Sequence, residues 1–175
     1  MTATPLDRIE TARMIGERYR PEHAPELAVL MLDPRVAPTL WPGPHSPTKA
    51  DVRRSVSEKI AHWKRYGFGM WLLRDRATGA VVGRGGLQHT AVTGAQEVEV
   101  GWATAPERWG EGLATELATA SIEVAFGPLG LDSVIAYSLA TNIASRRVME
   151  KAGFVYEREL NHASLAHVLY RRRPG

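Results

Sequence analysis

Residues 96–126 constrain the fold more strongly than any other part of the sequence. Over residues 96–104, valines and a tryptophan alternate with glutamates and a glycine, which is typical of a strand with one buried face. Glycines follow at positions 110 and 112, and apolar residues then recur at helical spacing from Leu113 until Gly127-Pro128 ends the pattern. A strand that leads through a glycine-containing turn into a helix predicts one right-handed parallel crossover. The chain is therefore expected to form a sheet with helices packed against it.

Further helices and strands are indicated on both sides of this segment. Helical spacing marks residues 23–32, residues 49–63 behind the capping residue Thr48, and residues 142–152 before Gly153. Strand-like patterns mark residues 68–74, 80–87, 131–139, 154–160 and 166–171, and the Pro-rich segment 34–47 is expected to be a structured loop. With 175 residues, 44% of them hydrophobic, we expect one domain over residues 1–175. The predicted class is α/β (α+β), with a mixed sheet covered by helices.

The composition argues against several classes of protein. The sequence contains no cysteine, so it cannot form a disulfide, a thiolate nucleophile or a cysteine zinc site, and its six histidines show no metal-ligand spacing, so we expect no metal. Lys and Arg total 22 against 19 acidic residues, a net charge of +3 that makes a nucleic-acid partner unlikely on charge grounds. We expect Arg171–Arg173 to be a solvated end; a nucleic-acid or ribosome-associated binder that uses them stays an open alternative. Without a membrane-spanning or leader-like stretch, a soluble cytoplasmic protein is expected.

The glycine-containing turn is the segment with chemical content. Gly110 and Gly112 permit left-handed backbone and close approach of a ligand, and the free N–H groups of the following helix favour a phosphate. A P-loop is excluded because Gly-Lys-Ser/Thr is missing, and a dinucleotide fingerprint because Thr115 stands where a third glycine is needed. An ordinary turn that merely begins a helix remains the alternative.

Four ordered segments resemble the GCN5-related N-acetyltransferase (GNAT) superfamily, and specifically its RimJ/RimL-like branch. Residues 9–14 are similar to the branch's opening Thr-x-Arg-Leu strand, and residues 99–102 to its Glu-Ile-Gly-Tyr strand. Residues 109–116 are similar to its Trp-Gly-x-Gly-x-Ala-Thr-Glu loop, and residues 142–154 to its Asn-x-x-Ser…Glu-Lys-x-Gly-Phe helix. The resemblance implies a mostly antiparallel sheet whose two central parallel strands splay apart, with helices on both faces.

The resemblance also implies acetyl-CoA as cosubstrate. The amides of Gly110, Gly112, Ala114 and Thr115 would hold the pyrophosphate, with Arg108 as an outer cation. Trp109 and Ala114 occupy the first and last positions of the general Gln/Arg-x-x-Gly-x-Gly/Ala pattern; Trp109 departs from it but is typical of the branch. The pantetheine arm would bond the backbone of Trp102, Ala103 and Thr104 and the side chain of Asn142.

Two residues are implied in the chemistry, each with a simpler alternative. Glu99 is the candidate general base, and Glu97 on the same strand face would share this role or raise the pKa of Glu99. The alternative is that both are solvent-facing strand acids. Met149 stands where many members have an acidic tyrosine, so Ser145 is the candidate that protonates the leaving thiolate. Helix capping alone is the alternative for Asn142 and Ser145.

The acceptor pocket is expected beyond the thioester, and its residues are inferred from the implied fold: Trp41, Trp71, His89, Glu97 and Tyr137. The expected acceptor is either a protein N-terminal α-amine or a small-molecule amine, and a homodimer is a further candidate assembly. A backbone N–H of Trp102 or Ala103 would receive the charge that develops on the thioester oxygen. A coenzyme A-responsive binding protein without catalysis is the alternative function, which the absence of the tyrosine supports.

Overall fold

The parallel crossover expected around the glycine-containing turn lies at the centre of the structure. In the computed structural model, which describes residues 5–175, β5 (Glu97–Thr104) leads through the short helix η2 (Pro106–Arg108) into α4 (Leu113–Phe126). The next strand, β6 (Val134–Leu139), then runs parallel to β5. Leu113 and Leu117 are buried where α4 packs on the sheet. The predicted parallel connection is confirmed.

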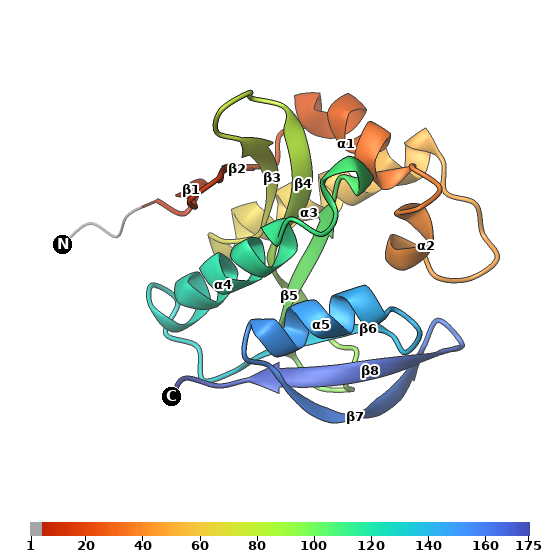
Figure 1. Ribbon diagram of the computed structural model, residues 1–175, viewed down its shortest axis with the longest axis vertical. Coiled ribbons are helices and arrows are strands. Elements are labelled where there is room, and N and C mark those ends of the chain that lie inside the picture. The colour runs from red at the N-terminus through yellow and green to blue at the C-terminus, as the bar shows by residue number, and fades with distance from the viewer. Residues whose placement is uncertain (1–4) are drawn as a thin grey trace.

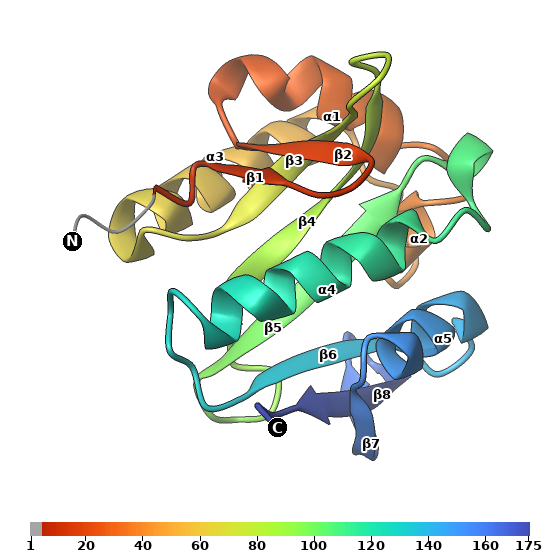
Figure 2. The same ribbon diagram turned by 60° about the vertical axis from the view of Figure 1, so that its left-hand side comes forward.

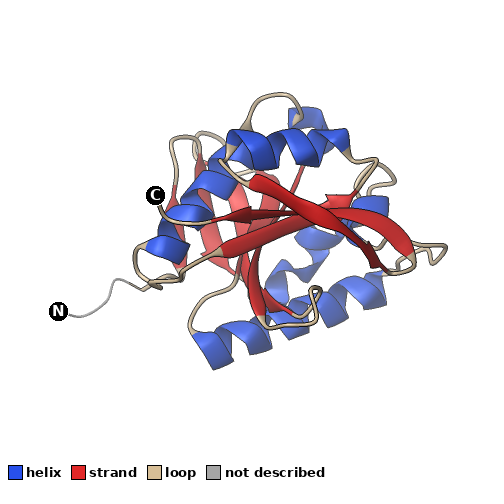
Figure 3. Cartoon of the chain, turned by 90° about the horizontal axis from the view of Figure 1, so that it is seen from below, coloured by secondary structure: helices blue, strands red, loops and turns tan. Residues whose placement is uncertain are grey.

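One mixed sheet contains all eight strands, in the order β1-β2-β3-β4-β5-β6-β8-β7. Every pair is antiparallel except β5 with β6. Seen from below, the β7–β8 hairpin crosses the strands behind it, which shows the strong twist of the sheet (Figure 3). The remaining elements are β1 (Arg8–Glu10), β2 (Met14–Arg18), η1 (Pro21–His23), α1 (Ala24–Met31), α2 (Ala37–Leu40), α3 (Lys49–Tyr66), β3 (Met70–Asp75), β4 (Val81–Thr90), α5 (Ile143–Lys151), β7 (Val155–His162) and β8 (Leu165–Arg172).

Helices cover both faces of the sheet, as expected (Figures 1 and 2). α4 and α5 lie together on one face, and α1 and α3 lie together on the other. α3 begins at a reciprocal cap, in which Thr48 accepts from the N–H of Asp51 and the Asp51 carboxylate accepts from the N–H of Thr48. It ends at Gly67 in the left-handed conformation. None of the helices among residues 5–175 is long and apolar enough to cross a bilayer.

The two central parallel strands pair at one position and then part. Glu99 of β5 lies opposite Ile135 of β6, and the ladder goes no further. On its other side β5 is paired with β4 along its whole length, from Glu97 to Thr104. β6 is likewise paired along its length with β8. The splayed pair that the family resemblance implies is therefore present.

Three regions differ from the sequence expectations. The opening segment forms two short strands, β1 and β2, because residues 11–13 turn the chain back on itself. The Pro-rich segment contains the short helix α2, which begins where Pro38 is tolerated in a first turn. Arg171 is not solvated: it pairs with Glu97 and Glu157 at 2.9 and 2.8 Å, and its side chain is 13% exposed.

The opening segment is fastened to the start of α4 by one carboxylate. Glu116 accepts hydrogen bonds from the hydroxyl of Thr11 at 2.5 Å and from the backbone N–H and Nε of Arg13, both at 2.8 Å. Arg13 also donates through Nη1 to the carbonyl of Glu111 in the glycine-containing turn. The first strands of the sheet thereby support the conformation of a loop about a hundred residues further along the chain.

Candidate active site

The turn before α4 presents a row of unused backbone donors. None of the N–H groups of residues 110–115 donates to an acceptor within residues 5–175, and the first that does is Glu116, which donates to the carbonyl of Gly112. Gly110 and Gly112 have φ of +82° and +83°, a conformation that side chains rarely adopt, and a Cβ built on Gly110 meets nothing within 4 Å. Free N–H groups at the start of a 14-residue helix favour a bound anion.

The polar side chains around this turn already have partners within the protein. Arg108, expected as an outer cation for the phosphates, is held by Asp75 at 2.9 Å and Glu111 at 2.7 Å, so its charge is already neutralised. Trp109 is half exposed, and its Nε1 donates to the carbonyl of Thr104. Arg13, which the sequence analysis missed, places Nη2 3.6 Å from the position of a Cβ on Gly112. Arg13 is itself paired with Glu116 at 2.8 Å, so both arginines already have a carboxylate partner.

The parting of β5 from β6 exposes alternate backbone groups of β5. The N–H of Ala105 donates to the carbonyl of Val82, at the end of the β4–β5 ladder. Because backbone groups alternate in direction along an antiparallel strand, the N–H of Ala103 also faces β4, whereas those of Trp102 and Thr104 face the gap. Trp102 is consequently better placed than Ala103 to donate to a ligand in the gap. This choice between the two amides could not be made from the sequence.

A cavity of about 370 Å³ opens beside this gap, on the face of the sheet that carries α3. Six of the residues expected at the active site line it together: Trp41, Glu99, Trp102, Tyr137, Asn142 and Ser145. They come from the segment after α2, from β5 and β6, and from the start of α5. The structure thus brings together a buried carboxylate and a strand gap that leads from the free amides.

Glu99 is buried on the cavity wall, with 7% of its surface exposed. The side-chain amide of Gln88, its partner across the β4–β5 ladder, donates to Glu99 Oε1. Glu99 Oε2 is buried and has no hydrogen-bond partner within residues 5–175. A carboxylate with one fixed and one unused oxygen can accept a proton from a group that enters the cavity. The alternative of a solvent-facing strand acid does not describe Glu99.

Tyr137 lies beside Glu99 on the neighbouring strand. Burial and the negative charge of Glu99 raise the pKa of this phenol well above its ordinary value, so Tyr137 stays protonated at neutral pH. Its ring is in edge-on contact with His162, at 5.5 Å between centroids. His162 and His167 both line the cavity. A protonated phenol at this place can donate a hydrogen bond to a bound molecule.

Asn142 and Ser145 begin α5 at the edge of the cavity. Asn142 is the N-cap residue, and its Oδ1 accepts from the N–H of Ser145 at 3.1 Å. The capping role is therefore present, and the Asn142 amide group keeps its own donors. Both residues also line the cavity, so capping and ligand contact are compatible here.

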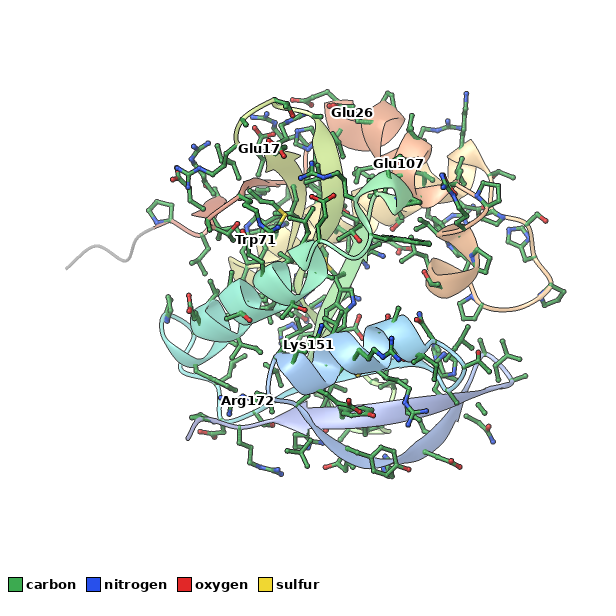
Figure 4. The ribbon with its side chains drawn as sticks, viewed as in Figure 1. Glu17, Glu26, Trp71, Glu107, Lys151 and Arg172 are labelled. Carbon is green, nitrogen blue, oxygen red and sulfur yellow. The ribbon has the colours of Figure 1, made fainter. Side chains whose placement is uncertain are left out.

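Three residues expected in the acceptor pocket lie elsewhere. Trp71 is fully buried in the core, where its ring packs against Trp63 and its Nε1 donates to the carbonyl of Leu6 (Figure 4). His89 belongs to a separate aromatic group with His62, whose Nε2 accepts from the N–H of His89. Glu97 forms its ion pair with Arg171 instead of facing the cavity. Alternation along a strand does not reveal which neighbouring strand supplies such a partner.

Sequence reasoning also missed several polar residues of the cavity, among them Gln88, Arg84 and Lys59. Gln88 is identified only by the register of β4 with β5, which places it opposite Glu99. Arg84, between two glycines of β4, and Lys59 of α3 also line the cavity. A signal for Lys59 was available, since it is three residues after the buried Val56 and four before the buried Trp63. A lysine on the buried stripe of an amphipathic helix is unusual.

The described residues contain no group of three or more His, Asp or Glu side chains that could hold a metal ion. The chain matches a family model described as an acetyltransferase (GNAT) domain over residues 13–155. The protein YkkB of Bacillus subtilis (strain 168), described as uncharacterized, is 28% identical over 125 residues, which are 71% of this chain and 73% of that protein.

Solved structures share this fold. An acetyltransferase from Agrobacterium tumefaciens str. C58 matches with a TM-score of 0.81 at 23% identity, over 95% of this chain and 94% of that one. RimL, a ribosomal L7/L12 alpha-N-protein acetyltransferase in complex with coenzyme A, matches with a TM-score of 0.77 at 17% identity, over 95% of this chain and 97% of its own. At such identities the likeness concerns the fold.

Proposed function

The chain belongs to the acetyltransferase (GNAT) domain family, and we propose that it transfers the acetyl group of acetyl-CoA to a primary amine by direct attack of that amine. The observation that carries this proposal is the position of a buried carboxylate, Glu99, on a cavity beside the strand gap, with the free amides of residues 110–115 close to the same strand. A cosubstrate with a diphosphate and a long narrow arm suits these three features together.

The residues present fit coenzyme A. The N–H groups of residues 110–115 would hold the diphosphate, supported by Arg13. The N–H of Trp102 and the side chain of Asn142 would bond the pantetheine arm in the gap between β5 and β6. Arg108 would act on the loop indirectly, because its ion pair with Glu111 fixes the turn. Acetyl-CoA supplies the thioester carbonyl that the amine attacks.

Glu99 would remove the proton that the amine loses. Its Oε2 is unused while Gln88 holds Oε1, so the carboxylate is oriented before the acceptor binds. An α-amine, with a pKa of about 8, is partly neutral at physiological pH, whereas a lysine at about 10.4 is not. The more fully an amine is protonated at this pH, the more its reaction depends on Glu99 as the proton acceptor.

The leaving thiolate requires less help than the amine. A thiol of pKa about 8.5 leaves readily, so Ser145 would assist by a hydrogen bond at most. Its place on the cavity wall at the first turn of α5 supports that role. The helix cap at Asn142 would then hold Ser145 in position.

Two classes of acceptor agree with this chemistry. A protein N-terminal α-amine is supported by the likeness in fold to RimL, and a small-molecule amine by the limited volume of the cavity. The test is to incubate the purified protein with acetyl-CoA and a panel of peptides and small amines. Free thiol is then measured, together with a gain of about 42 daltons, the mass of one acetyl group, in the acceptor. If neither signal arises with any acceptor, a coenzyme A-responsive binding protein becomes the better description.

Glu99→Gln is the variant that tests the base. We expect kcat/KM to fall by about 10²- to 10⁴-fold, the usual contribution of general base catalysis, while binding of coenzyme A is retained. The matched control is Glu123→Gln, an exposed glutamate on α4, which should retain the activity of the unmodified protein. A fall of less than threefold in Glu99→Gln would show that another group takes the proton.

A further inference from the structure

Two cations on the cavity wall have no carboxylate partner. Lys59 of α3 and Arg84 of β4 both line the cavity, and neither forms an ion pair within residues 5–175. Arg84 Nε is buried without an acceptor, and Nη1 reaches only the sulfur of Met70, at 3.8 Å. By contrast, Arg54 on the same helix pairs with Asp51 at 3.1 Å near the exposed rim. An unpaired buried cation is unfavourable unless a ligand supplies the negative charge.

The charged groups around Lys59 do not provide it with an ion-pair partner. Burial lowers the pKa of Lys59, and the nearby charge of Arg84 lowers it further, although Glu99 and Glu58 act in the opposite direction. Glu58 is exposed, and Asp51 is already bound by Thr48 and Arg54. Of the acids that line the cavity, Glu99 therefore remains to offset Lys59 and Arg84, and one carboxylate cannot balance two cations. Lys59 occupies a position on the buried stripe of α3 at which an apolar residue is usual.

Glu99 and Arg84 lie at two separated positions on the wall of the cavity. In the β4–β5 ladder, Gln88 lies opposite Glu99 and Arg84 lies opposite Ala103, four residues further along β5. Opposed residues, and those two apart, share a face of the sheet, so the Glu99 and Arg84 backbones are separated by about 13 Å on the same face. Gly101 lies between them on the cavity wall, and the Met70 methyl group lies 3.1 Å from the position that a Cβ on Gly101 would take. The charge of Lys59 interacts with that of Glu99 and with that of Arg84.

We propose that the acceptor is a small amine that carries an anionic group, such as a carboxylate or phosphate, and that Lys59 and Arg84 bind this group while the amine lies at Glu99. This inference deepens the proposed function, since it takes the amine acceptor from it. A dipolar acceptor matches the polarity of the cavity at both ends. A polyamine would place positive charge beside Lys59 and Arg84, and a neutral amine would leave both cations unpaired.

The volume of the cavity favours a small molecule over a peptide. About 370 Å³ must accommodate both the acetyl end of the cosubstrate and the acceptor. The residues that line it come from α1 (Met31), α2 (Leu40) and the β7–β8 hairpin (His162 and His167). Amino acids and amino phosphates fit these limits. A peptide N-terminus with an acidic first residue offers the same charges but continues into a longer chain.

The experiment compares kcat/KM for amine acceptors of different charge, each anionic amine being paired with a neutral counterpart. Glycine, β-alanine and phosphoethanolamine represent the anionic class, glycinamide and ethanolamine the neutral class, putrescine the cationic class, and an Asp-initiated peptide the macromolecular source. We expect at least one small anionic amine to exceed its neutral counterpart by about 10- to 150-fold, the effect of one charge-assisted hydrogen bond. A neutral or cationic amine that reacts as well as every anionic one, or a preference for the peptide, would overturn the proposal.

Lys59→Met and Arg84→Met connect the preference to these residues. In each, the ratio of kcat/KM for the anionic amine to that for its neutral counterpart should fall by about 10-fold or more. Arg84→Lys should retain part of the preference, because it keeps the charge without the planar donor fork. Lys64→Met, an exposed lysine of the same helix, is the matched control and should keep the ratio of the unmodified protein. An unchanged ratio in both Met variants would contradict the assignment.

Calorimetry separates this inference from the proposed function. With coenzyme A present, the protein is titrated with the best anionic amine and with its neutral counterpart. The anion site is supported if the protein binds the anionic amine and not its neutral counterpart, and if Lys59→Met and Arg84→Met weaken that binding. This holds even if no acetyl transfer occurs, and the proposed reaction would then be wrong. Acetyl transfer to neutral amines with no binding preference would leave the proposed function intact and refute the anion site.

Discussion

Replacement of Glu116 by alanine tests how the beginning of the chain supports the glycine-containing turn. The carboxylate is 17% exposed and accepts from Thr11, from the N–H of Arg13 and from the Arg13 guanidinium. The two hydrogen bonds from uncharged donors to this partly exposed carboxylate contribute about 1 kcal/mol each, and the ion pair less than about 1 kcal/mol. The variant should therefore lose about 2–3 kcal/mol of unfolding free energy, a fall in Tm of about 5–10 °C for a chain of this size.

The assay is urea unfolding followed by tryptophan fluorescence, with thermal melting as a second measure. Glu123→Ala is the control, because Glu123 is exposed on the same helix and its loss should change stability by less than about 0.5 kcal/mol. Thr11→Ala combined with Glu116→Ala should be less destabilising than the sum of the two single changes. If Glu116→Ala changes stability no more than the control does, the proposed fastening of β1 and β2 to α4 is wrong.

The contribution of Glu116 should also depend on pH. Burial raises the pKa of Glu116, but the hydrogen bonds from Thr11 and Arg13 outweigh it and the pKa is lowered overall from 4.5. A lowered folded-state pKa stabilises the protein above the unfolded value, and this stabilisation is lost as the pH falls through the folded value. The stability difference between the unmodified protein and Glu116→Ala should be full at pH 7 and should shrink below about pH 4. A difference that stays constant down to pH 3 would contradict the assignment.

Three further outcomes are expected. Asn142→Ala should lower the free energy of unfolding by about 1 kcal/mol in urea, because the α5 cap is lost, whereas Asn142→Asp should retain most of that stability. An equal loss in both variants would argue against the cap. Lys59→Met should leave Tm unchanged or raised, since it removes a half-buried charge without an ion-pair partner, and a fall of several degrees would show that Lys59 has a structural partner. Arg171→Met should lower the free energy of unfolding by about 1–3 kcal/mol, because it leaves Glu97 unpaired. DNA binding should be the same in this variant as in the unmodified protein. If the unmodified protein binds DNA in a salt-dependent manner and the variant does not, the nucleic-acid alternative is restored.

The order of elements was accessible from the sequence because it depends on local patterns. Alternation over residues 96–104 and helical spacing after Leu113 follow from which side chains face the core, and the structure confirms both elements. Thr48 and Gly67 bound α3 by capping rules that act within one turn. The short strands β1 and β2 were harder to recognise, because their pairing depends on the turn at residues 11–13 and on β3.

The candidate site was only partly accessible, since its composition depends on pairing between distant segments. The resemblance placed Glu99 and the start of α5 at the site, and the structure lines one cavity with both. It could not exclude Glu97, because the partner Arg171 comes from a strand whose register no local pattern fixes. Trp71 is aromatic like many pocket residues, but its strand position turns the ring into the core. Lys59 was identifiable only as an exception to the apolar stripe of α3.

The most direct test of the account is the response of the backbone amides of residues 110–115 to coenzyme A, measured by NMR on isotope-labelled protein. Titration with coenzyme A should shift the resonances of these amides and slow their hydrogen exchange, whereas pantetheine, which lacks the diphosphate, should affect Trp102 and leave residues 110–115 nearly unchanged. Coenzyme A that binds without any change at residues 110–115 would contradict the claim that this turn holds the diphosphate.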